Sequence, residues 1–429
     1  MRILFLLGLL TVALMAIDVR AASPTIEVLH IKGTINPVVS DYVKRGIEHA
    51  EASDAVACII QLDTPGGLDT AMRDIIKKII DTRVPVVVYV SPSGARAASA
   101  GVFITLAAPV AAMAPSTAIG AAHPVSVGAQ GEATMSSTME EKVVNDAAAY
   151  IRGLAQAHGR NMEWAEKAVR ESVSADAREA LKLNIVDLIA PDLNNLVAQL
   201  EGRQVVMPDG RQVTLRTKGA TVNHNPMTTM ESFLYAISDP NIAYLLLSLA
   251  MIGIAAELYN PGLIFPGVIG GISLLLAFYS LGMLPVNYAG VLLIVLAFAL
   301  FTAELFTHSF GMLTAGGITS LVLGSLILFK GGPMFQVNPG LIATTTIIIA
   351  AFFVFVVSRV IAAHRRQATT GKEELIGKTA TVRIALNPEG MVLLKGELWT
   401  AVSETGHAEP GEEVTITRVD GLKLYVNKK

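Results

Sequence analysis

The hydrophobic pattern between residues 25 and 200 alternates between two periods. The β-branched run TIEVLHIKGTI is followed by the amphipathic segment PVVSDYVKRGIEHAEAS, and AVACIIQLDTPGG is followed by LDTAMRDIIKKIIDT. A short β-branched run predicts a strand, whereas apolar residues spaced three and four apart predict a helix. Strands that alternate with helices form a parallel sheet with helices on its faces. We therefore expect an α/β domain over residues 23–220.

The pattern changes between Ile242 and Ala363, where long apolar runs replace the short ones. Each run is close to the ~20 residues that an α-helix needs to cross the hydrocarbon core of a bilayer. The runs cover about residues 242–259, 263–282, 288–306, 310–329 and 341–363. We expect a transmembrane domain of about five spans over residues 241–366, preceded by a polar linker, residues 221–240.

This apolar block contains an internal repeat. The segment AELYNPGLIFPGVIGGIS from Ala256 recurs as AELFTHSFGMLTAGGITS from Ala303, about 47 residues later. Two spans separate the copies, so both have the same orientation, as in a parallel repeat. Glu257 and Glu304 occupy matching positions near the ends of their spans. These carboxylates fit either a proton or ion site or polar groups that cap the bundle at the interface, and the second interpretation is favoured.

Both ends of the chain carry further predictions. Residues 1–22 have a basic start, an apolar run and small residues near Ala21, which is typical of a secretory signal. Residues 367–429 alternate in polarity and contain glycine turns, which predicts a small all-β barrel of the OB type. Its mixed charges and few aromatic residues favour a protein-interaction module over a binder of single strands. The basic HRRQ cluster after the last span favours a cytoplasmic carboxyl terminus.

Composition narrows the possible chemistry. Charged residues make up 16% of the chain and the net charge is −3, so we expect no nucleic-acid partner. The single cysteine, Cys58, excludes an intrachain disulfide and a cysteine-based zinc site. The histidines between the signal and the membrane block lack close ligand spacing. We therefore expect no metal site and no cofactor.

A serine among small residues marks the candidate chemistry. Ser99 lies in SGARAASAGVF, directly after the β-branched run PVVVYV, and the turn DTPGG follows the preceding predicted strand. Ligands of parallel α/β sheets bind at the carboxyl ends of strands, where both turns belong. A serine at a helix start has free amides around it, and Gly66 and Gly67 let a second backbone amide approach. The two turns together indicate a nucleophilic serine with an oxyanion site.

These motifs resemble a known group of proteins. LDTPGG, GARAASAG and SVSADAREALKLNIVDLI are similar to segments of the Clp-protease and crotonase superfold. The order of signal, protease domain, membrane block and β-domain resembles the NfeD family of membrane-bound serine proteases, the stomatin operon partner proteases, over essentially the whole chain. The resemblance implies that Ser99 is the nucleophile and Lys142 its base. It also implies oxyanion amides at Gly67, with Gly66 as a further candidate, and at Ala100.

Two residues compete for the role of general base. A lysine acts as a base only when it is deprotonated at the working pH, which burial favours. His123 lies 24 residues after Ser99, close to the spacing in the Ser–His–Asp triads of the Clp proteases that this domain resembles. Alignment with the Clp pattern places that pattern's histidine at Ala121, and a shift of two residues keeps the same strand face, so we expect His123 to line the site. The resemblance favours Lys142 as the base. The segment VSVGAQGEATMSST between the two candidates is rich in small polar residues and has no hydrophobic period, so we expect a flexible loop there.

The combined expectation is a membrane-anchored serine endopeptidase of the cell (inner) membrane. Its protease domain is extracytoplasmic, its β-domain is cytoplasmic, and its substrates are apolar segments of membrane-associated proteins such as stomatin- or flotillin-like partners. A tether to the bilayer brings the cleft close to lipid and to such substrates. By analogy with the superfold we expect a homo-oligomer. The alternative is a membrane scaffold for the same partners with weak or vestigial peptidase activity, and a crotonase-type acyl enzyme has little support.

Overall fold

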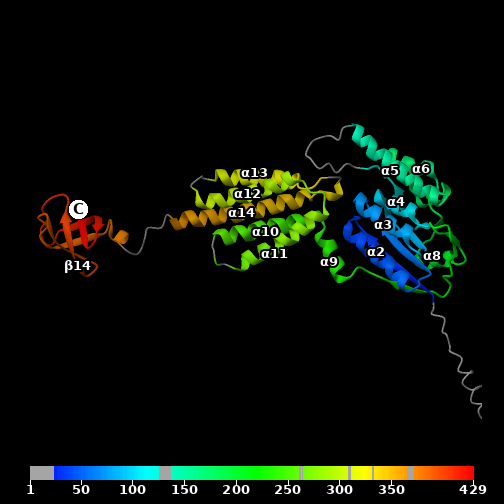
Figure 1. Ribbon diagram of the computed structural model, residues 1–429. Coiled ribbons are helices and arrows are strands. Elements are labelled where there is room, and N and C mark those ends of the chain that lie inside the picture. Colours follow the sequence, from blue (N-terminus) through cyan, green and yellow to red (C-terminus); the bar gives the residue numbers. More distant parts are fainter. Residues whose placement is uncertain are drawn as a thin grey trace, which may run out of the picture. The chain divides into compact units, whose positions relative to one another are not determined.

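The computed structural model describes residues 24–124, 137–259, 262, 264–307, 311–330, 333–364 and 372–429 (Figure 1). The expected signal, residues 1–22, and most of the expected loop between His123 and Lys142 lie outside these ranges. The chain divides into two compact units, one of Met1–Ala303 with Phe310–Ile347 and one of Glu304–Ser309 with Ile348–Lys429.

The α/β domain is built on a parallel sheet of six strands in the order β11-β1-β2-β3-β5-β8. Every neighbouring pair in this sheet runs parallel, as the alternation of strands and helices predicts. The strands are β1 (Thr25–Lys32), β2 (Ala57–Asp63), β3 (Val86–Val90), β5 (Val110–Met113), β8 (Leu188–Ile189) and β11 (Thr221–His224). The α/β class expected from the sequence is confirmed.

Side chains of the sheet alternate between two buried layers. Leu29, Ile60 and Val88 belong to a core shared with helices α2 to α7, whereas Val28, Ile59 and Val87 belong to a core shared with α8. The alternation follows from the two-residue period of a strand. The helices are α2 (Pro37–Ala52), α3 (Asp69–Asp81), α4 (Ala100–Ala107), α5 (Ser137–Ala157), α6 (Met162–Arg170), α7 (Ala177–Lys182) and α8 (Leu193–Leu200).

Two smaller β elements complete this domain. A three-stranded sheet has the order β4-β6-β7, from β4 (Arg96–Ala98), β6 (Ala118–Gly120) and β7 (Ser174–Asp176). A hairpin pairs β9 (Gln204–Val206) antiparallel with β10 (Gln212–Thr214). The small sheet matters for function because β4 leads directly into Ser99.

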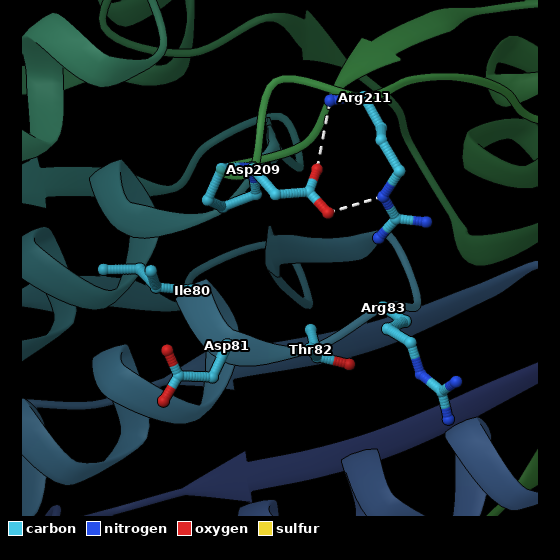
Figure 2. A pocket seen from close by; sticks show the side chains of 7 residues that line it. Ile80, Asp81, Thr82, Arg83, Asp209 and Arg211 are labelled. Carbon is cyan, nitrogen blue, oxygen red and sulfur yellow. Dashed lines mark hydrogen bonds and ion pairs between the residues drawn. The ribbon is translucent and has the colours of Figure 1, made fainter.

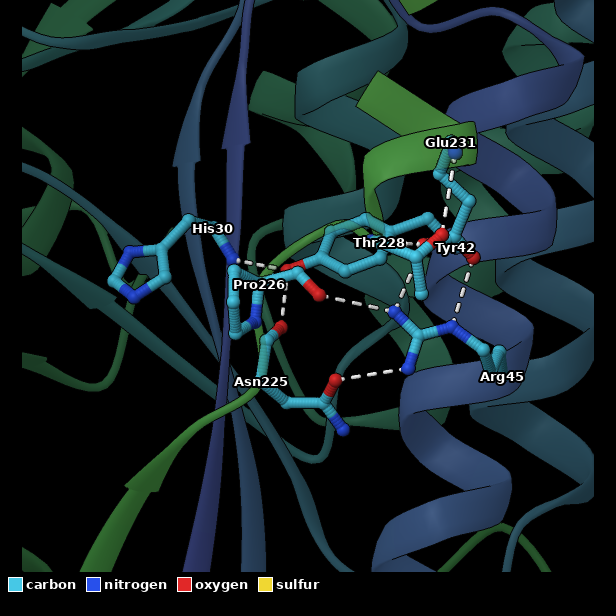
Figure 3. A network of polar contacts seen from close by, with 7 residues as sticks. All are labelled: His30, Tyr42, Arg45, Asn225, Pro226, Thr228 and Glu231. Atoms are coloured by element: carbon cyan, nitrogen blue, oxygen red, sulfur yellow. Dashed lines mark hydrogen bonds and ion pairs between the residues drawn. The ribbon is translucent and has the colours of Figure 1, made fainter. Parts of the chain in front are cut away.

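The expected linker, residues 221–240, is not a free tether. It contributes the edge strand β11 and the helix α9 (Thr229–Ile237). Arg45 of α2 holds α9 with a two-pronged ion pair, in which its Nε and Nη2 donate to the Glu231 carboxylate at 2.8 and 2.9 Å (Figure 3). Arg45 Nη1 also donates to Asn225 Oδ1 at 2.9 Å, and Tyr42 donates to the Asn225 carbonyl oxygen at 2.7 Å. The linker is therefore fastened to α2 before the membrane block begins.

The described part of the apolar block contains five α-helices. They are α10 (Pro240–Tyr259), α11 (Phe265–Met283), α12 (Tyr288–Phe306), α13 (Met312–Leu326) and α14 (Pro339–His364). Four of them, α10, α11, α12 and Pro339–Val356 of α14, are long and apolar enough to cross a bilayer. The fifth, α13, is apolar but has only 15 residues, fewer than the ~20 of a full span. The expectation of about five spans thus corresponds to four full-length helices and one short one.

Small residues bring the helices of each repeat copy together. A Cβ at Gly253 of α10 would lie 2.7 Å from Gly270 Cα of α11, and a Cβ at Gly290 of α12 would lie 2.7 Å from Leu328 Cα, just after α13. Such close backbone contact is the usual way that helices associate in membranes. The two hairpins, α10–α11 and α12–α13, correspond to the two copies of the sequence repeat.

The repeat carboxylates lie near the ends of matching helices. Glu257 of α10 accepts a hydrogen bond at Oε1 from the Gly262 amide, at 3.2 Å, and its side chain lies against Gly267. Glu304 of α12 is buried. The Glu257 contact is that of a carboxylate closing a helix–helix turn.

The carboxyl-terminal domain is a closed five-stranded barrel with the order β12-β13-β14-β16-β15. Its strands are β12 (Thr379–Ile384), β13 (Glu389–Leu394), β14 (Glu397–Ser403), β15 (Glu413–Asp420) and β16 (Lys423–Lys428). Alternate residues such as Val382, Val392 and Leu424 fill its core. The small OB-like barrel expected from the sequence is confirmed.

Candidate active site

Three backbone segments run side by side at the carboxyl end of β2. The Thr64 amide donates to the Arg96 carbonyl oxygen at 2.7 Å, and the Ala98 amide donates to the Thr64 carbonyl oxygen at 3.1 Å. On the other side, Ile35 pairs in parallel with Gly67. The DTPGG turn is therefore held between the segment after β1 and the strand β4. Ser99 follows β4 of the small sheet rather than β3, which the sequence pattern alone did not separate.

Ser99 is the N-cap of α4 and has an unusual backbone conformation. Its φ of 50° and ψ of −114° lie in a region that side-chain-bearing residues rarely adopt. The Ser99 amide donates to the Ala121 carbonyl oxygen at 3.2 Å, which holds the turn. Its side chain has no hydrogen-bond partner among the described residues and is half-buried. A strained serine with a free hydroxyl at a helix start is suited to nucleophilic chemistry.

Gly66 packs directly against this serine. A Cβ at Gly66 would lie 2.7 Å from Ser99 Cβ and 3.1 Å from Ser99 Oγ. Its φ of +125° also disfavours any side chain. The Gly66 amide is engaged, because it donates to Thr64 Oγ1 at 3.0 Å.

Two other amides near the serine have no partner among the described residues. In the pairing with Ile35, the bonds are made by the Gly66 carbonyl oxygen and the Leu68 amide, at 2.9 and 2.8 Å. The groups of Gly67 therefore point away from Ile35, because successive amides of an extended segment point to opposite sides. The Ala100 amide is at the first position of α4, where helix amides lack an internal acceptor. Both amides can donate to an oxygen that carries negative charge.

Lys142 lies in the second turn of α5 and is exposed to solvent. No hydrogen bond or ion pair joins it to another described residue, so the structure does not bring it into contact with Ser99. Its helix packs against α4, the helix that begins at Ser99. The Lys142 amine is therefore accessible to a group that enters from solvent.

His123 lies two residues after the carbonyl that holds the Ser99 amide. Its Nδ1 lies 2.8 Å from the Val169 carbonyl oxygen of α6. A carbonyl oxygen only accepts, so Nδ1 carries the hydrogen and Nε2 is the acceptor of the neutral ring. This contact ties His123 to the backbone and leaves Nε2 as its basic nitrogen.

The opposite end of α4 is closed by residues that the sequence analysis did not single out. Arg160 donates from Nη1 to the Leu106 carbonyl oxygen at 2.9 Å and from Nη2 to Asp187 Oδ2 at 2.7 Å. His158 Nε2 donates to the Ala107 carbonyl oxygen at 3.0 Å. Burial, then the cation of Arg160, lowers the pKa of His158. Hydrogen bonds to the last carbonyls of a short helix fix its axis, and the sequence carries no local signal for them.

The α/β domain also contains a pocket of about 340 Å³ (Figure 2). It is lined by the end of α3 with the following turn, and by the β9–β10 turn, where Asp209 pairs with Arg211. Since α3 starts just after Gly67 and runs for 13 residues, the pocket is roughly 20 Å from the serine end of that helix. This pocket is separate from the candidate active site.

An N-cap serine at positive φ, in a chain that also has membrane helices and a β-barrel, fits the class of membrane-bound serine proteases. The membrane-bound protease PH1510 of Pyrococcus horikoshii is 39% identical over 416 residues, which cover 94% of this chain and 93% of that protein. The chain belongs to the NfeD family. It is a multi-pass membrane protein and an enzyme of the serine protease class.

Three family models match successive parts of the chain. The NfeD1b N-terminal domain matches residues 25–200, the NfeD integral membrane domain matches residues 241–359, and the NfeD-like C-terminal, partner-binding domain matches residues 372–428. The membrane protein NfeD1b of Bacillus subtilis is 28% identical over 447 residues, covering 99% of this chain and 97% of that protein. A solved structure of the 1510-N membrane protease specific for a stomatin homolog, from Pyrococcus horikoshii, is 35% identical, with a TM-score of 0.45, and covers 51% of this chain and 100% of its own.

Proposed function

We propose that this protein is an endopeptidase in which Ser99 is the nucleophile and Lys142 the general base, with the amides of Gly67 and Ala100 as oxyanion donors. The observation that carries the proposal is the setting of Ser99. A serine held at positive φ at the start of α4, packed against Gly66, has a free hydroxyl beside two unpaired amides. This combination serves acyl transfer and has no evident structural purpose.

The proposed reaction has two steps. Ser99 Oγ attacks the scissile carbonyl carbon while its proton passes to neutral Lys142 Nζ, and the negative charge develops on the former carbonyl oxygen near the two amides. The C–N bond then breaks, and the lysine returns the proton to the leaving amine. In the second step, water attacks the acyl carbon and gives its proton to the lysine. The bond between that carbon and Ser99 Oγ then breaks, and the lysine returns the proton to Oγ as the acid leaves. The positive end of the α4 dipole adds to the stabilisation of the oxyanion.

Lys142 is preferred over His123 as the base because its Nζ has no partner among the described residues, and because a substrate that covers this exposed amine would favour its neutral form. His123 is already bonded through Nδ1 to the backbone of α6, which suits a residue that shapes the cleft. Lys142 reaches Ser99 if substrate binding draws the start of α5 toward α4, since catalytic hydrogen bonds often tighten only in the substrate complex. The alternative, a base at His123 Nε2, is separated from this proposal by the variants below.

We further propose that the substrates are apolar segments of membrane-associated proteins and that the partner is of the stomatin type. The attachment of the linker to α2 keeps the catalytic domain close to the bilayer. The relatives support the stomatin-type partner, because the solved 1510-N protease is described as specific for a stomatin homolog and the barrel matches a partner-binding domain. An exported catalytic domain, a cytoplasmic barrel and a homo-oligomer belong to the same proposal.

The match of the barrel to a partner-binding domain also favours a second candidate function, a membrane scaffold that gathers such partners. A Ser99→Ala variant distinguishes the protease function from the scaffold function. A variant that assembles and binds partner normally but loses its cellular function supports the protease, whereas one that keeps full cellular function supports the scaffold.

The direct test measures cleavage of a fluorescence-quenched apolar peptide by the full chain in detergent. Wild type is compared with Ser99→Ala, Lys142→Ala and His123→Ala. We expect a loss of at least ~100-fold in the serine and lysine variants, the size that removal of a nucleophile or base produces, with His123→Ala active. If cleavage is lost in Ser99→Ala and His123→Ala but kept in Lys142→Ala, then His123 and not Lys142 is the base. Cleavage by Ser99→Ala would overturn the proposal.

A further inference from the structure

Arg73 lies where three helices meet, each of which adjoins one part of the proposed catalytic set. The helix α3, which carries Arg73, begins two residues after Gly67. Ser99 is the N-cap of α4, and Lys142 is in the second turn of α5. A group that fixes these helices to one another therefore also fixes the oxyanion segment, the nucleophile and the base.

The contacts of Arg73 reach all three helices. Within α3, its Nε donates to Asp69 Oδ2 at 2.9 Å. Toward α5, its Nη2 donates to Asp146 Oδ2 at 2.5 Å, and its Cζ lies 4.5 Å from the centroid of the Tyr150 ring. Tyr150 in turn stacks on Phe103 of α4, with ring centroids 6.0 Å apart. The guanidinium thus joins α3 to α5 directly and to α4 through one aromatic ring.

These contacts define which face of α5 turns toward the catalytic helices. Lys142, Asp146 and Tyr150 follow one another at intervals of four residues, so they lie along one side of the helix. Because Asp146 and Tyr150 both contact Arg73, the side that carries Lys142 faces α3. Lys142 is one turn before Asp146, about 6 Å along the helix axis.

We propose that Arg73 is a positioning residue for the proteolytic reaction and acts through Lys142. It sets the rotation and position of the first turns of α5, so that the lysine amine can reach Ser99 Oγ when substrate binds. This inference rests on the proposed Ser99/Lys142 function and adds to it the residue that positions Lys142.

The charge of Arg73 is permanent in this setting. Partial burial alone would lower the pKa of its guanidinium, but the carboxylates of Asp69 and Asp146 outweigh this effect and raise the pKa. The contribution of these pairs to stability is small, because the side chains of Arg73 and Asp146 are 38% and 67% exposed. Exposed ion pairs are worth at most ~1 kcal/mol. Removal of Arg73 should therefore disturb the position of α5 while the fold persists.

The test uses the full chain in detergent, the quenched apolar peptide and the rate of labelling of the serine by a fluorophosphonate. For Arg73→Ala we expect a fall in kcat of at least ~10-fold, a KM within ~2-fold of wild type and a thermal midpoint within a few degrees. Arg73→Lys keeps the charge but loses the planar fork, so its rate should be intermediate. Arg152→Ala is the matched control, because Arg152 is on α5 but pairs with Glu166 of α6.

The decisive comparison is a double-mutant cycle with Lys142→Ala. If Arg73 acts through the lysine, Arg73→Ala has no further effect on the labelling rate in the Lys142→Ala background, and the two single variants show pH–rate profiles of the same shape. A full additional loss in that background, or unchanged kcat in Arg73→Ala, would overturn the inference while leaving the Ser/Lys dyad in place. Full activity in Lys142→Ala alone would instead overturn the dyad, and the positioning role with it.

Discussion

Adjacent glycines at the site serve different purposes. Gly66 is needed for its missing side chain and its positive φ, because a Cβ there would collide with Ser99. Gly67 is needed because a Cβ would lie 2.1 Å from the Ile35 carbonyl oxygen, and its amide is the one left unpaired. The motif predicts that glycines allow a close backbone approach. It does not predict which of the two amides is free, because that depends on the pairing with Ile35, which lies about thirty residues earlier.

Gly66→Ala should abolish peptidase activity, with a fall of at least ~100-fold, because its Cβ displaces the Ser99 side chain and the nucleophile leaves its attack geometry. Peptide cleavage by the full chain measures this effect. The matched control is Gly94→Ala, where φ is also positive, at +89°, but nothing lies within 4 Å of the added Cβ. Equal losses in both variants would show that backbone strain, and not contact with the serine, is responsible.

At the scale of elements, α4 is a short helix that is fixed at both ends. Ser99 begins it with an amide bond to Ala121, and its last carbonyls accept hydrogen bonds from Arg160 and His158. The sequence predicts the start of this helix, because a serine follows a β-branched run and small residues follow the serine. The residues that close its end come from a segment more than fifty positions later, so no local pattern could indicate them.

His158 should make the stability of the protein depend on pH. Its pKa is lowered in the folded state by burial, so the unfolded chain binds the proton more tightly. The stabilising contribution is complete above the ordinary histidine pKa of 6.5 and is lost as the pH falls below it, with a slope of at most ~1.4 kcal/mol per pH unit. Thermal midpoints of the wild type should therefore fall more between pH 7.5 and 5.5 than those of His158→Gln. Parallel curves for the two proteins would contradict this assignment.

The link between α2 and α9 leads to a second prediction at this scale. Arg45→Ala leaves the largely buried Glu231 without its cation, so residues 225–237 should open more often. We expect amide hydrogen exchange in this segment to rise by roughly tenfold, the equivalent of ~1.4 kcal/mol. Lys44→Ala is the control, since the ion pairs that the neighbouring Lys44 makes with described residues are to exposed aspartates. Exchange that is unchanged in Arg45→Ala would show that other contacts hold α9.

For the whole molecule, the hydrophobic pattern predicts the three structural classes with little ambiguity. Apolar residues that recur every two residues, or every three to four, identify the strands and helices of the α/β domain. The long apolar runs identify the membrane helices. Finer features depend on contacts between distant segments. The short length of α13, the ordered linker and the separate strand before Ser99 all arise from tertiary pairing, which a local pattern does not contain.

The proposed topology can be checked with single cysteines in intact cells. The native Cys58 is fully buried, and burial raises its pKa to about 12, so it should not react with a maleimide. Ser93→Cys places an exposed thiol in the catalytic domain, and Gly406→Cys places one in the barrel. A membrane-impermeant maleimide should label the first and not the second until the membrane is opened. Labelling of both cysteines in intact cells would contradict the proposal that the catalytic domain and the barrel lie on opposite sides of the membrane.

The measurement that tests the central claim most directly is mass spectrometry of the full chain after treatment with a fluorophosphonate. We predict one covalent adduct, located on Ser99, which forms rapidly in the wild type and much more slowly in Lys142→Ala. Ser99→Ala should take up no label. An adduct on another serine, or equal labelling of the Ser99→Ala protein, would contradict the assignment of Ser99 as the nucleophile.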